Sequence, residues 1–249
     1  MIITISGQYG SGGNEVGMRL AEILDYKVFD AQLIVRAREI YMETGGRADK
    51  PSWWPSLSLK PYGDDDIFPR LGTALGQAEL ELQSDQMTSE SSFANLGSET
   101  ENFRRAMLES LTAAIAEYTK SGDCILFGKC SDFILRGLPD TIHVFSTADM
   151  DVRISRIMSQ YNLNLDNVRG SKWLPPSYTL QEAGQLLNME RRDALELMYT
   201  TDKRRADLFE FLTGEHWGDL AHFDYHIVGN DLDLEMQTSL LLEFVREKM

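Results

Sequence analysis

Residues 7–14, which read Gly-Gln-Tyr-Gly-Ser-Gly-Gly-Asn, have the composition of a loop that binds phosphate through its backbone. Glycine permits positive φ angles, and without a Cβ it lets several backbone N–H groups point at one anion. The helix expected after this loop adds the positive end of its dipole at the same place, and Asn14 is a candidate N-cap. The candidate anion-binding residues are Gly7, Gly10, Ser11, Gly12, Gly13 and Asn14.

The spacing fits the register Gly-x-x-x-x-Gly-Lys-Ser/Thr, but two residues that do chemistry in that register are absent. Gly13 stands at the position of the lysine that neutralises the β- and γ-phosphate oxygens. Asn14 stands at the position of the hydroxyl that binds magnesium. The loop could therefore hold phosphate through its backbone alone. A glycine-rich turn between strand and helix without any ligand is the alternative interpretation, since such turns are common in parallel α/β domains.

The elements that position this loop are predicted from the hydrophobic pattern. Short apolar runs rich in β-branched residues alternate with amphipathic helical patterns, the order that forms a parallel sheet flanked by helices. The glycine-rich loop follows the first run, so it would lie at the carboxyl edge of the sheet, where ligands collect. The predicted strands are residues 2–5, 27–29, 124–127, 141–146 and 225–228.

We expect one α/β domain over residues 1–249, with an insertion at 47–97 and a lid at about 161–212. The first part of the insertion holds four prolines, Trp53 and Trp54, and three consecutive aspartates, too many helix and strand breakers for a core element. Long irregular segments in compact domains are usually lids, binding loops or disordered. The lid carries a local concentration of lysine and arginine in an acidic chain.

Composition limits the classes of partner and the compartment. The chain has 24 Lys and Arg against 39 Asp and Glu, a net charge of −15, which opposes general attraction to nucleic acid or to an anionic membrane. The two cysteines, Cys124 and Cys130, lack zinc spacing and are expected to be reduced, and no metal site is predicted. With no basic leader and no apolar run near 18 residues, we expect a cytoplasmic protein, with homo-oligomerisation left open.

Segments spread along the chain match one family pattern. They are Ile3-Thr4-Ile5-Ser6 with Tyr9-Gly10-Ser11-Gly12-Gly13, Phe29-Asp30 with Leu33-Ile34, Gly128 with Asp132-Phe133-Ile134-Leu135, Arg153 with Arg156, Asp202-Lys203-Arg204-Arg205-Ala206, and Thr213-Gly214 with Trp217-Gly218-Asp219 and Phe223-Asp224-Tyr225. The chain thereby resembles the cytidylate kinase-like family, relatives of the nucleoside monophosphate kinases. The resemblance implies a P-loop kinase-like fold, ATP and magnesium as cofactors, and transfer of the ATP γ-phosphate to a CMP-like nucleotide.

The resemblance also implies roles for the cations, because phosphoryl transfer needs positioning and charge neutralisation more than covalent catalysis. Lys203, Arg204 and Arg205 fit a catalytic lid, and a solvated helix face is their alternative. Arg153 and Arg156 precede the lid and could reach the donor nucleotide. Packing or surface ion pairing is the alternative for these two arginines.

Three residues are candidates for binding the acceptor. Asp30 follows the second predicted strand at the carboxyl edge of the sheet, and it could equally be the N-cap of the next helix. Asp132 is either a carboxylate of the site or a charge at a helix N-terminus. Lys129 stands where the family pattern commonly has arginine.

Departures from the family pattern lower the positive charge near the loop. Gly7 and Asn14 stand where arginine is common, and Ala31 where a basic residue is common. A catalytically degenerate member that acts as a nucleotide-binding or protein-interaction module is therefore the alternative to an active ATP-dependent phosphotransferase. A third interpretation makes residues 47–97 the main partner surface.

Overall fold

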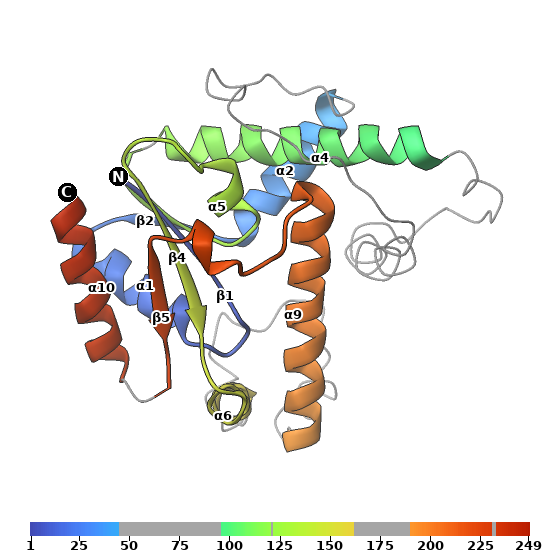
Figure 1. Ribbon diagram of the computed structural model, residues 1–249. Helices are drawn as coiled ribbons and strands as arrows, with labels where there is room; N and C mark the ends of the chain where they lie inside the picture. Colours follow the sequence, from blue (N-terminus) through green and yellow to red (C-terminus); the bar gives the residue numbers. More distant parts are fainter. Residues whose placement is uncertain (45–95, 121, 162–189, 231–232) are drawn as a thin grey trace, which may run out of the picture.

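The computed structural model describes residues 1–44, 96–120, 122–161, 190–230 and 233–249 (Figure 1). The insertion predicted at 47–97 lies outside the described residues except where it meets the helix that starts at Leu96. Residues 162–189 of the predicted lid lie outside the described residues as well.

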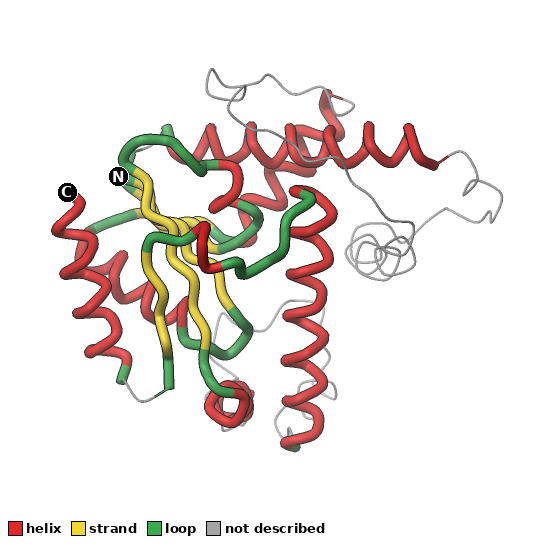
Figure 2. Tube along the Cα trace, viewed as in Figure 1, coloured by secondary structure: helices red, strands yellow, loops and turns green. Residues whose placement is uncertain are grey.

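A five-stranded sheet forms the centre of the structure (Figure 2). The strands are β1 (Ile2–Gly7), β2 (Lys27–Phe29), β3 (Cys124–Phe127), β4 (Thr141–Thr147) and β5 (Tyr225–Val228). Their order is β2-β3-β1-β4-β5 and every pairing is parallel, which confirms the predicted fold class. Because β1 is the central strand, the loop that follows it lies between the ends of β3 and β4.

Helices cover both faces of the sheet, as the near-continuous apolar strands require. On one face lie α1 (Gly13–Leu24) and α10 (Leu234–Lys248), whose buried side chains pack with β1, β3 and β4 (Figure 1). On the other face lie α2 (Ala31–Thr44), α4 (Leu96–Thr119), α5 (Ser131–Ile134) and the end of α9 (Arg191–Thr213). No helix in the described ranges is both long and apolar enough to cross a membrane.

The helix α6 (Met150–Tyr161) packs against α9, and a short helical turn, η3 (Leu220–His222), leads into β5. The contact between α6 and α9 is closed by Ile154 and Ile157 from one helix and Ala194 and Met198 from the other, all fully or almost fully buried. Tyr9 of the glycine-rich loop packs against this cluster. The apolar contact therefore places both helices beside the loop.

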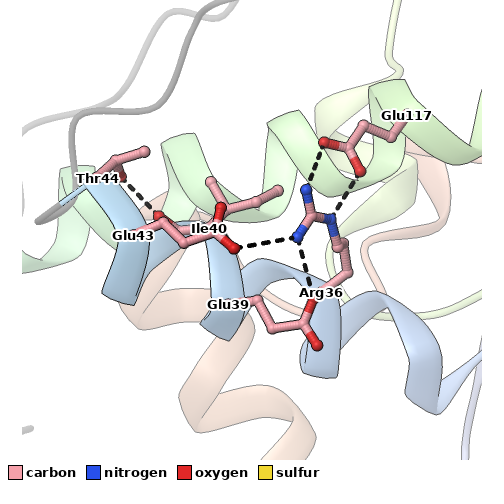
Figure 3. Close-up of polar contacts among 6 residues, drawn as sticks. All are labelled: Arg36, Glu39, Ile40, Glu43, Thr44 and Glu117. Atoms are coloured by element: carbon pink, nitrogen blue, oxygen red, sulfur yellow. Dashed lines mark hydrogen bonds and ion pairs between the residues drawn. The ribbon is translucent and has the colours of Figure 1, made fainter.

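Arg36 joins α2 to α4 by polar contacts (Figure 3). Its Nε and Nη2 donate to the two carboxylate oxygens of Glu117 at 2.7 and 3.0 Å, and its Nη1 donates to Glu39 at 3.0 Å. These hydrogen bonds raise the pKa of Arg36 and lower the pKa of Glu117. The bidentate contact fixes α2 against α4. Helix α2 ends shortly before the insertion, and α4 begins at the end of the insertion.

Candidate functional site

The glycine-rich loop enters α1 through Gly12, whose φ is 92°. The carbonyl of Gly12 accepts the Val16 N–H at 3.1 Å, so Gly12 is the N-cap. The prediction that Asn14 caps the helix is wrong, because the helix already begins at Gly13 and Asn14 lies in its first turn. The N–H groups of Gly13 and Asn14 donate to no described residue. They are available to an anion at the positive end of the α1 dipole.

β4 packs so closely under the loop that two positions must be glycine. An ideal Cβ on Gly7 would lie 2.7 Å from the Ser146 carbonyl oxygen. A Cβ on Gly13 would lie 2.7 Å from the Ser146 Cβ and 3.1 Å from its Oγ. The buried Ser146 hydroxyl has no hydrogen-bond partner within the described structure. The space that a lysine stem needs at position 13 is therefore occupied by Ser146.

Two arginines of α6 bind carbonyl oxygens of the loop. Arg153 Nε donates to the Tyr9 carbonyl at 2.8 Å. Arg156 Nη1 donates to the Ser11 carbonyl at 2.9 Å, and its Nη2 donates to the Gly229 carbonyl at 2.6 Å. Arg153 and Arg156, which were assigned from the sequence to the donor nucleotide, thus both bind the backbone of the loop.

Of the three cations predicted for the lid, the structure brings one to the loop. Arg205 Nη1 donates to the Gly7 carbonyl at 2.6 Å, and its guanidinium carbon lies 5.5 Å from the centre of the Tyr9 ring. Burial lowers the pKa of Arg205, and the neighbouring Asp202 carboxylate opposes that shift. Lys203 is exposed and pairs with Asp207 at 2.9 Å. Arg204 is exposed as well.

The acceptor-side candidates lie at the ends of β2 and β3. Lys129 Nζ forms an ion pair with the Asp30 carboxylate, and both side chains are partly exposed. Lys129 and Cys130 have φ of 56° and 57°, a strained backbone for residues other than glycine, directly after β3. Such strain persists where surrounding contacts hold it, and it is frequent at binding sites.

Asp132, the third acceptor-side candidate, is buried in the first turn of α5. Its Oδ1 accepts a hydrogen bond from the Ser6 hydroxyl at 3.1 Å. Burial raises the pKa of Asp132, and the Ser6 hydrogen bond offsets part of that shift. Ser6 precedes Gly7, so Asp132 is joined directly to the strand that carries the loop.

Three residues at the loop were not among the predicted site residues: Asp202, Ser146 and Gly229. Asp202 accepts hydrogen bonds from Tyr9 N–H and from Arg153. Two sequence signals point to it: Asp202 belongs to the segment 202–206 that matches the family pattern, and Asp202 and Arg205 are three residues apart and share one helix face. Ser146 and Gly229 carry no such signal. Ser146 lies beside Gly7 because β4 pairs with β1 in that register, and Gly229 lies against Ser11 because the chain passes the loop directly after β5.

No cluster of three His, Cys, Asp or Glu side chains that could hold a metal ion occurs in the described ranges. A magnesium ion that arrives with a nucleotide is held mainly by phosphate oxygens and water, with one or two protein ligands. Asn14, exposed in the first turn of α1, offers an amide oxygen for that purpose.

The parallel sheet of order β2-β3-β1-β4-β5, with a glycine-rich loop between its central strand and α1, defines the class of P-loop kinase-type folds. The chain belongs to the cytidylate kinase-like family, whose model matches residues 2–171. Comparison with curated proteins gives no match.

Solved structures resemble this chain in fold alone. An uncharacterized protein from Eubacterium ventriosum aligns at 16% identity with a TM-score of 0.56, covering 99% of this chain and 98% of that chain. A shikimate kinase from Bacteroides thetaiotaomicron aligns at 14% identity with a TM-score of 0.43, over 99% and 98% of the two chains. A shikimate kinase from Acinetobacter baumannii in complex with shikimate aligns at 16% identity with a TM-score of 0.38, over 99% and 93%.

Proposed function

We propose that this protein is a cytoplasmic phosphotransferase that transfers the γ-phosphate of ATP, with magnesium, to a CMP-like nucleotide. The observation that carries the proposal is the loop at Gly12, where the N–H groups of Gly13 and Asn14, at a helix N-terminus, have no partner in the described part of the chain. Backbone amides without Cβ atoms suit phosphate oxygens, so the residues present fit a nucleotide phosphate. Buried, unpaired thiols at both cysteines support the proposed compartment.

In this proposal, the chain's own residues position phosphate groups and balance their charge. Arg205 uses one nitrogen for the Gly7 carbonyl, and its remaining guanidinium N–H groups have no partner among the described residues. Five donors in a planar fork allow one arginine to hold both the loop and a phosphoryl oxygen. Asp30 and Lys129 at the neighbouring strand ends would hold the acceptor, and Asp132 would hold it or orient the strand end through Ser6. Magnesium supplies charge neutralisation between the transferred phosphate groups when it is bound.

Two observations favour the second candidate, a nucleotide-binding module without catalysis. Ser146 closes the lysine position at Gly13, and Arg153 and Arg156 are both engaged by carbonyl oxygens. The loop would then retain backbone phosphate binding with little cationic charge to stabilise a transition state.

Calorimetric titration of the full chain with a non-hydrolysable ATP analogue and magnesium, followed by CMP, tests the proposal. The phosphotransferase predicts binding of both ligands, and then transfer of phosphate to CMP in a direct assay. Binding of the ATP analogue without transfer to any nucleoside monophosphate supports the second candidate. Absence of nucleotide binding at millimolar concentration, by a folded sample, overturns both.

The Gly12→Val variant locates the binding at the loop. A β-branched side chain at a φ of 92° distorts the loop, and its Cβ would also lie 3.3 Å from Arg156 Nη1. Gly137→Val is the matched control, because Gly137 has a φ of 80° and open space around its Cβ position, in the connection between α5 and β4. We expect Gly12→Val to reduce nucleotide affinity at least tenfold and Gly137→Val to leave it unchanged. Equal affinities would place the nucleotide elsewhere.

A further inference from the structure

The carboxylate of Asp202 joins the glycine-rich loop to both helices beside it. Its Oδ1 accepts the backbone N–H of Tyr9 at 2.7 Å, and its Oδ2 forms an ion pair with Arg153 Nη2. The side chains of Asp202 and Arg153 are 18% and 7% exposed, so little solvent competes with these contacts. Arg153 in turn donates to the Tyr9 carbonyl at 2.8 Å. Both polar groups of the Tyr9 backbone are thus held through one ion pair.

The contact with Tyr9 N–H sets the direction of a peptide group that closes the loop. A trans peptide is planar, with its N–H and C=O pointing in opposite directions. When Tyr9 N–H points to Asp202, the Gln8 carbonyl of the same peptide group points away from α9. In this orientation the carbonyl accepts the Ser11 N–H at 3.1 Å. That turn leads directly to Gly12, the N-cap of α1.

Arg205 lies one turn further along the same helix and binds the preceding part of the loop. Its Nη1 donates to the Gly7 carbonyl at 2.6 Å, while Asp202 accepts from Tyr9. Residues three apart share a helix face, so α9 holds the peptide groups on both sides of Gln8. The position of α9 and the conformation of the loop are therefore coupled.

We propose that Asp202 is a positioning residue of the phosphate loop: it orients the Gln8–Tyr9 peptide so that the turn to Ser11 closes and the amides of Gly13 and Asn14 converge on a phosphate. The role in ligand binding rests on the proposed function, because it takes the ligand of the loop to be a nucleotide phosphate. The orientation of the peptide group is independent of any ligand.

Amide hydrogen exchange in the unliganded full chain tests the orientation directly. In Asp202→Leu, we expect amides of residues 8–11 to exchange at least tenfold faster than in the parent protein. Asp202→Asn keeps an oxygen that accepts Tyr9 N–H but loses the charge and presents an NH₂ group, which cannot accept, to Arg153 Nη2, so we expect a three- to tenfold increase. Glu210→Gln is the control, because Glu210 lies on the same helix and contacts His216 rather than the loop. In this control variant, the amides of residues 8–11 should exchange at the same rate as in the parent protein.

Asp202→Leu leaves Arg153 buried without its partner, so the fold of this variant is checked by circular dichroism. If the leucine variant does not fold, the test rests on Asp202→Asn alone. Exchange at residues 8–11 equal to the parent in Asp202→Asn and in any folded leucine variant overturns the proposal. The affinity for the ATP analogue gives a second readout, in which the asparagine variant is expected to bind three- to tenfold more weakly than the parent. Faster exchange in a protein that binds no nucleotide at all supports the positioning role and rejects only the proposed function. Faster exchange with unchanged nucleotide affinity overturns the link to ligand binding.

Discussion

The contact between position 13 and Ser146 can be measured by introducing a single methyl group. Gly13→Ala places a Cβ 2.7 Å from the Ser146 Cβ, about 1 Å inside the usual carbon–carbon separation of about 3.5–4.0 Å. Overpacking of this kind costs about 1–3 kcal/mol of unfolding free energy. Replacing glycine by alanine also restricts the unfolded chain, which stabilises the protein by about 0.4–1 kcal/mol. The free energy of unfolding of the single variant should therefore fall by between about 0 and 2.6 kcal/mol.

A double-mutant cycle isolates the steric part of this change. Ser146→Gly removes the opposing Cβ, so Gly13→Ala in that background should retain only the entropic gain. The coupling free energy is then about 1–3 kcal/mol, since the entropic contribution cancels between the two backgrounds. Ser146→Ala is the control, because it removes the hydroxyl at 3.1 Å but keeps the closer Cβ at 2.7 Å, and it should give a smaller coupling than Ser146→Gly.

Urea unfolding followed by far-ultraviolet circular dichroism measures the four free energies, provided that the slope with denaturant is the same in all variants. A coupling below about 0.5 kcal/mol in the Ser146→Gly cycle would refute the argument that Ser146 occupies the lysine position. If the argument holds, Gly13→Lys in the Ser146→Gly background should fold and bind the ATP analogue at least tenfold more tightly than Ser146→Gly alone.

Three further predictions follow from the side-chain contacts. Arg205→Ala should lower kcat at least tenfold with a smaller change in KM, because the guanidinium N–H groups that no described residue engages would act on the transferred phosphate. Identical kinetics in variant and parent would assign Arg205 to the loop backbone only. The lowered pKa of Glu117 means that its stabilising contact with Arg36 is fully present above about pH 4.3, the unfolded value, and is lost as the pH falls through the folded pKa. The Tm difference between parent and Glu117→Gln should therefore be largest near pH 7 and disappear in acid, whereas a pH-independent difference would contradict the ion pair. Burial raises the pKa of Asp132, so the folded state loses stability as the pH rises from about 3.9, the unfolded value, through the folded pKa. Asp132→Asn should thus gain Tm relative to the parent as the pH rises above about 3.9, and a Tm difference that does not change with pH would contradict the raised pKa of Asp132.

The strands and the glycine-rich loop could be predicted from the sequence because both depend on local preferences. The run that forms β1 is rich in β-branched residues, the run that forms β3 is apolar throughout, and the glycines after β1 permit the φ of 92° at Gly12. The parallel arrangement followed from the alternation of such runs with helical patterns. The family assignment rests on motifs of the same local kind.

The contacts of the loop could not be predicted, because they join residues far apart in the chain. Arg153 and Asp202 meet the loop across 144 and 193 residues, and no local pattern states which oxygen an arginine will reach. The N-cap was misassigned to Asn14 for a related reason: asparagine is a good cap, but the close approach of β4 and the positive φ of Gly12 decided where the helix begins.

The central position of β1 also determines when the loop can form during synthesis. β1 pairs with β3 and β4, which begin more than 120 residues later, and Arg205 binds the Gly7 carbonyl across 198 residues. At about 5–20 residues per second, a ribosome needs about 10–40 s to translate the chain from Gly7 to Arg205. A nascent chain that has already emerged past its glycine-rich loop would therefore lack the residues that hold the loop in shape, so the loop should reach its final conformation only after most of the protein has been translated.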